Sequence, residues 1–201
     1  MFLFLDVASP IPEFHLINDK KIIFSMKIEE DISKKLSDSI IPTYLKINKN
    51  YNLSKNVTNL ILTTGPGSYT ALRVGASFIA GLSQSMNLPV CIISSETIYN
   101  FFYDIDKQIG IYFESSNNQK FFSYKKESNF IHEKVENEKY VVPNFISHLF
   151  YNFNSSLFIN KKIYSETFLI KEVVLKSLNK LKFKKNLLIK PIYISNNIIL
   201  N

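Results

Sequence analysis

The sequence is poor in the residues that most often build disulfides and metal sites. Its 201 residues include one cysteine, three histidines and no tryptophan. Cys91 cannot form an internal disulfide, and its apolar neighbours predict a core thiol, which fits a reducing compartment. His15, His132 and His148 lie far apart in the chain. The sequence therefore excludes a disulfide framework and gives no support for zinc or iron ligation.

Long apolar runs are also missing. No segment approaches the roughly 20 apolar residues of a membrane-spanning helix. The opening MFLFL is shorter than a signal-peptide core, lacks a basic start and is followed at once by Asp6. We therefore expect a cytoplasmic protein without membrane contact. The hydrophobic content of 46% is sufficient for a sizeable core in one or two small domains.

Glycine and arginine are scarce, and both are concentrated in one stretch. Four of the five glycines, and the only arginine, Arg73, lie between Gly65 and Gly81. The apolar run at 57–62 predicts a buried strand, and residues 70–87 show helical spacing. Between them lies the turn motif Gly65, Pro66, Gly67 and Ser68, where Ser68 or Thr70 can cap the helix.

A glycine-rich turn before a helix can hold an anion. A Walker loop, however, needs a lysine followed by Ser or Thr after its last glycine, and none is present. A dinucleotide fingerprint needs a third glycine where Thr70 stands, and Pro66 replaces its free residue. We therefore interpret the turn as structural.

Small residues lie four apart on the predicted helix. The pairs are Ala71 with Gly75, Ala76 with Ala80, and Ser77 with Gly81. A glycine inside a helix costs roughly 1 kcal/mol relative to alanine, which the close approach of another backbone would offset. Two interpretations stay open: packing on this chain's own sheet, and contact with a helix of a second chain.

The same stretch resembles a known family. GPGSYTALRVGASFIAGLSQSMNLPV at residues 65–90, followed by Ser94 and Ser95, is similar to the signature of the TsaB (YeaZ) family, with Ala71 where glycine is usual. The opening FLFLDVAS and the PIYI at 191–194 resemble that family's first strand and closing segment. The resemblance implies an α/β protein with the actin-like ASKHA (ribonuclease H-like) fold, in two lobes of mixed sheet with flanking helices.

The resemblance also implies a function. A TsaB-like chain is a non-catalytic scaffold or activator that pairs with TsaD, and with TsaE, to support threonylcarbamoyl transfer to adenosine beside the tRNA anticodon. In the family, two helices form a bundle with the partner. The residues implied at that surface are Leu36, Ile40 and Tyr44 on the first helix, and Tyr69, Thr70, Ala71, Arg73, Val74, Gly75, Ser77 and Gly81 on the second. A homodimer is an open possibility for the isolated chain.

Two lobes are expected. The first covers residues 1–99, and a smaller, divergent basic lobe covers 100–201, with 191–201 open to returning to the first lobe. The first lobe should contain strands at 2–7, 13–18, 21–26, 57–62 and 89–94, and helices at 31–48, capped by Ser33, and 70–87. The second should contain a hairpin at 110–113 and 119–124, helices at 141–153 and 165–181, and a strand at 156–160.

Nucleotide chemistry is the alternative function. Active ASKHA proteins place an acidic residue at the end of the first strand, usually followed by Gly and Thr. Here Asp6 is followed by Val7, Ala8, Ser9 and Pro10, and Pro10 has no backbone N–H. We therefore predict no catalytic residue, cofactor or metal in this chain, with ATP and metal in the partner. A nucleotide-binding ATPase of the same fold remains the alternative.

Most of the net charge of +7 lies in residues 100–201. Two clusters there mix lysines with aromatic residues: Lys120, Phe121, Phe122, Tyr124, Lys125 and Lys126, and Lys182, Phe183, Lys184 and Lys185. Such clusters can bind single-stranded nucleic acid, but they also occur on solvated strands and tails. Contact with tRNA through the complex, or a free-standing RNA-binding module, therefore stays open.

Overall fold

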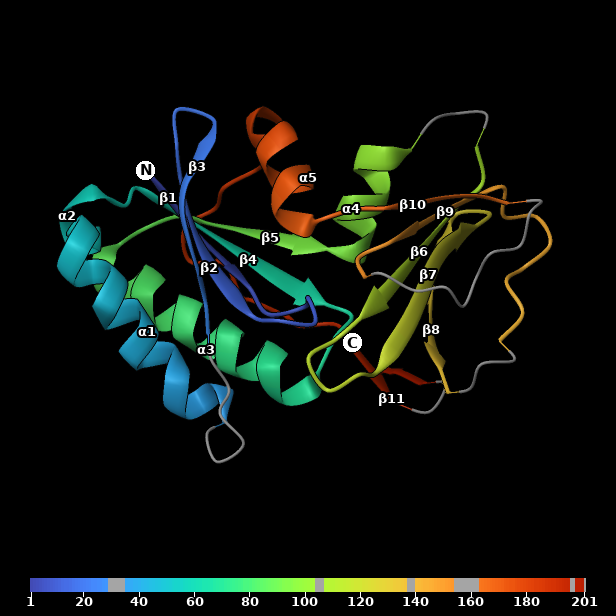
Figure 1. Cartoon of the computed structure of the whole chain (residues 1–201), viewed down its shortest axis with the longest axis horizontal. Helices are drawn as coiled ribbons and strands as arrows, with labels where there is room; N and C mark the ends of the chain where they lie inside the picture. The colour runs from blue at the N-terminus through green and yellow to red at the C-terminus, as the bar shows by residue number, and fades with distance from the viewer. Residues whose placement is uncertain (29–34, 104–106, 137–139, 154–162, 196–197, 201) are drawn as a thin grey trace.

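Two five-stranded sheets lie side by side and define two lobes (Figure 1). The computed structural model describes residues 1–28, 35–103, 107–136, 140–153, 163–195 and 198–200. Both sheets are mixed, since each contains parallel and antiparallel pairs. The expected two-lobe α/β arrangement is therefore present. Among the described helices, none is long and apolar enough to cross a membrane.

The first sheet has the strand order β3-β2-β1-β4-β5. The first three strands, β1 (Phe2–Asp6), β2 (Glu13–Asn18) and β3 (Lys21–Lys27), form an antiparallel meander. Strand β4 (Asn59–Gly65) pairs parallel with β1, and β5 (Val90–Ser94) pairs parallel with β4. The central strands β1 and β4 are almost fully buried, as their continuous apolar runs predict.

Helices α1 (Leu36–Tyr51) and α3 (Tyr69–Met86) cover one face of the first sheet, while α5 (Ile170–Lys176) lies on the other (Figure 1). The short α2 (Leu53–Asn56) follows α1, with Pro42 inside α1. Ser33, the expected cap, lies outside the described residues. Ser68 occupies the N-cap position of α3 but makes no side-chain capping bond, which corrects that part of the prediction.

The second sheet has the order β10-β9-β6-β7-β8. After α4 (Ser95–Phe102), the expected hairpin is formed by β6 (Ile109–Glu114) and β7 (Lys120–Lys126). The remaining strands are β8 (Asn129–Val135), β9 (His148–Tyr151) and β10 (Tyr164–Thr167).

Two helix predictions in this lobe are wrong. Residues 148–151 form β9 rather than part of a helix, because they pair parallel with β6 and bury Leu149 and Phe150. The helix expected at 165–181 is shorter, since β10 takes its first residues and only α5 and the 3₁₀ turn at Leu178–Lys180 are helical. The strand expected at 156–160 lies outside the described residues.

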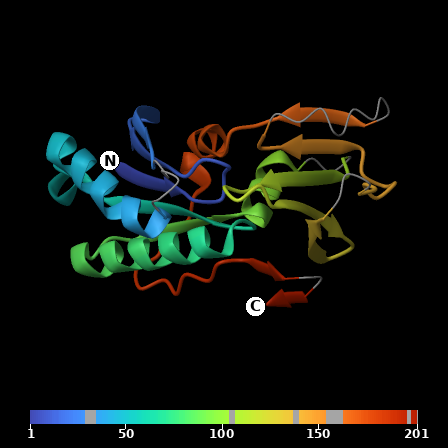
Figure 2. The same cartoon turned by 60° about the horizontal axis from the view of Figure 1, so that its bottom comes forward.

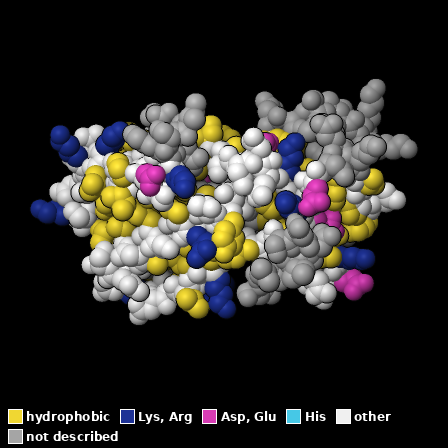
Figure 3. All heavy atoms as spheres, turned by 90° about the horizontal axis from the view of Figure 1, so that it is seen from below, with side chains coloured by type: hydrophobic (Ala, Val, Ile, Leu, Met, Phe, Trp, Pro, Cys, Tyr) yellow, Lys and Arg dark blue, Asp and Glu magenta, His cyan; other side chains and the backbone are white. Residues whose placement is uncertain are grey.

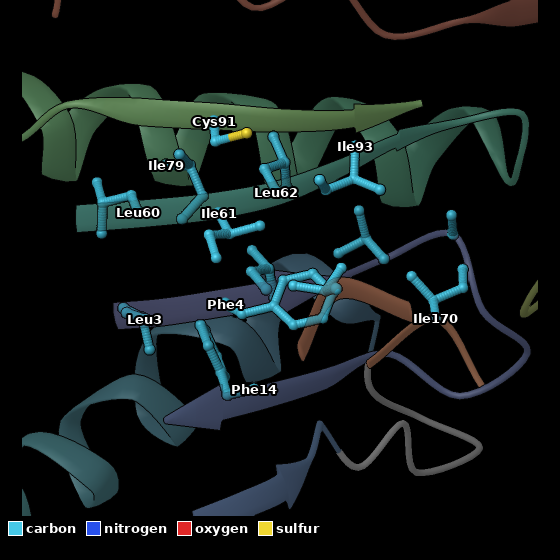
Figure 4. Close-up of a cluster of buried hydrophobic side chains, with 14 of the residues drawn as sticks. Leu3, Phe4, Phe14, Leu60, Ile61, Leu62, Ile79, Cys91, Ile93 and Ile170 are labelled. Carbon is cyan, nitrogen blue, oxygen red and sulfur yellow. The ribbon is translucent and has the colours of Figure 1, made fainter. Parts of the chain in front are cut away.

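The larger of two hydrophobic clusters among the described residues extends through both lobes, and the smaller lies in the second lobe. Figure 4 shows part of the larger cluster, with labelled side chains from β1, β2, β4, β5, α3 and α5 packed together. Phe102 of α4 stacks on Phe150 of β9 at a ring-centre distance of 4.1 Å, which extends the core into the second sheet. Cys91 is buried in the core, and burial raises the pKa of its thiol to about 11, as expected for an inert thiol.

The C-terminal segment passes along the first lobe and then reaches β8 of the second lobe. Lys184 forms an antiparallel bridge with Val90 of β5, and the N–H of Ile192 donates to the carbonyl of Thr64 at 2.8 Å. Figure 2 shows this red segment leading to β11 (Tyr193–Ser195), which pairs with β12 (Ile198–Leu200). The segment therefore passes the turn at the start of α3, where its contacts bear on the candidate site.

Candidate functional site

A groove of about 400 Å³ lies between α1 and α3 on the outer side of the first lobe. It is lined by Ser37, Ile40, Ile41, Arg73, Val74, Ser77 and Phe78. Figure 3 shows this face of the molecule, where hydrophobic side chains gather over the two helices. The groove is therefore mainly apolar, with the guanidinium of Arg73 as the charge in its lining.

Helix α1 has apolar residues on two sides. Ile40 and Ile47 are buried against the sheet, as expected for the inner face of an amphipathic helix. Ile41 and Leu45, one helical turn apart, are 54% and 56% exposed. Together with the groove they extend the apolar surface of this face, and contiguous apolar surface is a feature of interaction sites.

Gly75 of α3 faces this chain's own sheet. A Cβ on Gly75 would lie 2.9 and 3.0 Å from the two Cγ atoms of Val7, and 3.4 Å from Leu62 Cδ1. Ala71, one turn earlier, is also buried. The small residues at these two positions therefore allow α3 to pack on its own sheet, which corrects the expectation that they contact a second chain.

The other residues expected at a partner surface separate into two sets. Leu36 and Ile40 are buried within the chain, although Ile40 forms part of the groove floor. Tyr44 and Val74 are half-buried, and Tyr44 packs its ring against Phe14 and Phe78. The exposed residues are Tyr69, Thr70, Arg73, Ser77 and Gly81. Of these, Tyr69, Arg73, Ser77 and Gly81 follow one another at four-residue spacing along the outer side of α3.

The sequence analysis missed three groove residues, Ser37, Ile41 and Phe78, and also the exposed Leu45, one turn after Ile41. Ile41 and Leu45 do carry a signal, since they form a second apolar pair at four-residue spacing beside the stripe of Leu36 and Ile40. A helix that has two adjacent apolar stripes has more apolar surface than one sheet can cover.

The glycine-rich turn is packed rather than open. Gly65, Pro66, Gly67 and Ser68 are all buried. Gly65 has φ +104°, and a Cβ there would lie 2.9 Å from Leu72 Cδ1 and 3.1 Å from the carbonyl oxygen of Ile192. Glycine is required at this position by conformation and by space. The turn brings β4, α3 and the C-terminal segment together, in agreement with a structural interpretation.

Asp6 closes the loop that follows β1. Its Oδ1 accepts from the N–H of Ala8 at 3.0 Å and from the hydroxyl of Thr63 at 2.9 Å, and Oδ2 accepts from the hydroxyl of Ser9 at 2.6 Å. Burial raises the pKa of Asp6, against the opposing effect of these hydrogen bonds. Both carboxylate oxygens thus accept hydrogen bonds that cap the loop, and Asp6 also lines the adjacent hollow.

A second hollow of about 270 Å³ lies between the lobes beside Asp6. On its wall Glu13 Oε2 lies 3.2 Å from Lys171 Nζ and 3.4 Å from His15 Nε2. Burial lowers the pKa of His15 to about 3, with a smaller effect from Lys171, so the imidazole is neutral. In the tautomer whose Nε2–H is directed at the Glu13 carboxylate, Nδ1 accepts from Ser25 Oγ at 2.7 Å. Within the described part of the chain, no group of His, Cys, Asp and Glu residues could hold a metal ion.

The two lysine-rich clusters do not form base-stacking surfaces. Phe121, Phe122 and Tyr124 are buried in the sheet of the second lobe. Phe183 is half-buried and packs against Phe2 at 5.6 Å between ring centres, while Lys182, Lys184 and Lys185 are exposed. The aromatic residues therefore belong to the core, and the lysines are solvated.

Comparison with known proteins gives one family and one fold. A sequence model of the family described as TsaD, tRNA N6-adenosine threonylcarbamoyltransferase, matches residues 23–137. Two solved structures share the fold at 13% identity, over 96% of this chain and 99% of theirs. They are YeaZ from Pseudomonas aeruginosa, with a TM-score of 0.61, and a protein titled as uncharacterized with similarity to peptidase YeaZ from Pseudomonas aeruginosa, with 0.62. Comparison with curated protein sequences gives no match.

Proposed function

The chain belongs to the TsaD family of tRNA N6-adenosine threonylcarbamoyltransferases and has the ASKHA-like α/β fold of YeaZ along nearly its whole length; from this premise we propose that it is a non-catalytic, TsaB-type subunit. In this role it pairs with a TsaD-like catalytic chain, which holds the ATP and the metal. A TsaE-like ATPase completes the cytoplasmic assembly that transfers a threonylcarbamoyl group to tRNA adenosine.

The observation that carries the proposal is the apolar groove between α1 and α3. Ile41 and Leu45 expose more than half of their surface beside it. Covering such a surface with the helices of another chain removes apolar area from water, at roughly 25 cal/mol per Å². A chain of the same family can supply matching helices, because both partners then have the same fold.

The geometry around Asp6 supports a non-catalytic role. The carboxylate accepts hydrogen bonds from Ala8, Ser9 and Thr63, and Pro10 and Ile11 line the adjacent hollow. These hydrogen bonds use part of the accepting capacity of both carboxylate oxygens, which leaves less of it for a metal ion. The glycine-rich turn beside it is filled by Leu72, Ala8 and the C-terminal segment.

Reconstitution tests the proposal. The TsaD-like and TsaE-like chains of the same cell would be purified and assayed for threonylcarbamoyl transfer to tRNA, with and without this chain. We expect the transfer to depend on this chain and to be lost with Ile41→Asp. Ile23→Asp is the matched control, because Ile23 is a similarly exposed isoleucine (46%) on the edge strand β3. Full transfer without this chain would contradict the proposed role.

A further inference from the structure

Arg73 is the only arginine of the chain, and it lies in the lining of the apolar groove. Its Nη1–H donates to the hydroxyl of Tyr69 at 3.0 Å, and its guanidinium carbon lies 5.1 Å from the centre of the Tyr69 ring. Among the described residues, no carboxylate lies within ion-pair distance of this guanidinium. The charge of Arg73 is therefore held in place by an aromatic ring and left without an anion.

The Tyr69 ring is in turn supported by the C-terminal segment. Tyr193 packs against it with 4.6 Å between ring centres. Tyr193 is held there because the neighbouring Ile192 donates its N–H to the carbonyl of Thr64 at 2.8 Å and has its own carbonyl against Gly65. The chain of contacts from Tyr193 through Tyr69 fixes the position of Arg73 at the edge of the groove.

The groove and the arginine together restrict what can bind. A helix that covers the apolar floor removes water from the guanidinium, and a buried charge without a partner is strongly unfavourable. The remaining N–H donors of Arg73 form a planar fork that matches a carboxylate. Because Tyr69 already orders the side chain, less conformational entropy is lost when the pair forms.

We infer that the chain filling the α1/α3 groove presents an aspartate or glutamate to Arg73, and that Tyr193 is a positioning residue for this pair. The inference rests on the proposed function, since it takes the occupant to be the TsaD-like partner. A protein helix is favoured over RNA because the groove lining beside Arg73 is mainly apolar, and only the hydroxyls of Ser37 and Ser77 could join Arg73 in binding a phosphate. The acidic side chain gives the groove specificity for one partner among apolar helices.

Calorimetry of this chain with the purified TsaD-like chain tests the inference. Removing the charge with Arg73→Gln should weaken binding about tenfold or more, with Arg73→Lys between Arg73→Gln and the wild type. Tyr193→Leu should weaken binding several-fold, whereas Tyr193→Phe should retain it, because the ring and not the hydroxyl contacts Tyr69. Lys49→Gln, at an exposed cation in the last turn of α1, is the matched control and should have no effect.

The outcomes separate this inference from the proposed function. Wild-type affinity of Arg73→Gln, together with loss of binding by Ile41→Asp, would overturn the carboxylate pair and leave the docking surface in place. Wild-type affinity of both variants would overturn the docking surface itself. Asp38 is the acidic residue in the first turn of α1. If Arg73→Gln abolished only self-association in sedimentation, and Asp38→Asn did the same, the acidic partner would be a second copy. If it lowered only tRNA affinity, the site would be one for RNA. Either result overturns the inference.

Discussion

The side chain of Val7 occupies the space that a Cβ on Gly75 would need, with Cγ2 and Cγ1 at 2.9 and 3.0 Å from that position. Val7 is fully buried in the loop after β1, so it has little room to move. This contact joins the glycine-rich helix to the loop that Asp6 closes. It also gives Gly75 a role within the chain, in contrast to Gly81 on the same helix, whose Cβ position has no atom within 4 Å among the described residues beyond its chain neighbours and the nearby helix backbone.

The two glycines of α3 should therefore respond in opposite directions to the same change. We expect Gly75→Ala to lower the free energy of unfolding by about 1–3 kcal/mol, because overpacking outweighs the gain in helix propensity. Gly81→Ala should raise it by roughly 0.5–1 kcal/mol, since the site is open and helical. Urea unfolding of both variants measures the difference. A Gly75→Ala variant as stable as Gly81→Ala would contradict the packing described here.

Acid should destabilise the fold through its buried histidines. Burial lowers the pKa of His15 to about 3 and that of His132 to about 4, whereas both titrate near 6.5 when unfolded. Between about pH 6.5 and 4 the unfolded chain therefore binds protons that the folded chain does not. Stability rises with pH across this window, and each histidine contributes at most about 1.4 kcal/mol per pH unit.

The contribution of His15 can be isolated with His15→Gln, measured as unfolding free energy from pH 4 to 7. The raised pKa of Asp6 acts in the opposite sense, because that group favours the folded state at low pH and loses this effect as pH rises through its folded pKa. Asp6 is unchanged in the variant, so the difference between the two pH profiles reports His15. We expect a shallower slope in the variant, and equal slopes would mean that His15 is protonated in the folded chain.

The carboxylate of Asp6 should matter for folding rather than for nucleotide binding. Asp6→Asn replaces one accepting carboxylate oxygen of the loop by an NH2 group, which only donates. It should lower the free energy of unfolding by about 1–3 kcal/mol. Calorimetry with ATP and Mg²⁺ should show only weak binding by the wild-type chain, and no hydrolysis. A low-micromolar affinity that is lost in a folded Asp6→Ala variant would instead favour the ATPase alternative.

The lysines of the C-terminal segment should not contribute to tRNA binding. Their side chains are exposed, and the only ring among them, Phe183, packs on Phe2. We expect the triple change of Lys182, Lys184 and Lys185 to glutamate to leave the affinity of the assembled complex for tRNA, and its dependence on salt, unchanged. The slope of the logarithm of the binding constant against the logarithm of the salt concentration is the quantity to measure. A reduction of this slope by roughly 0.7–0.9 per lost phosphate contact would show that these lysines bind the tRNA backbone.

The first lobe could be predicted from the sequence because its signals are local. The apolar runs of β1 and β4, the turn at 65–68 and the spacing of α3 each lie within a few residues. The strand β9 could not be predicted in the same way, because it exists through parallel pairing with β6, far along the chain. The orientation of Gly75 depends likewise on Val7, which only the folded chain brings near. Of the residues expected at a partner surface, some therefore line the groove between the two helices, while Gly75 and Ala71 face this chain's own sheet.

The most direct test of the account is the affinity of this chain for the purified TsaD-like chain after changes on the outer side of α1. Ile41→Asp and Leu45→Asp should each weaken binding about a hundredfold or more, because a carboxylate would enter an apolar contact, while circular dichroism remains that of a folded chain. The control Ile23→Asp should bind like the wild type. Wild-type affinity in both α1 variants would contradict the groove between α1 and α3 as the functional site. If Ile23→Asp lost affinity instead, the interface would lie on the edge strand β3.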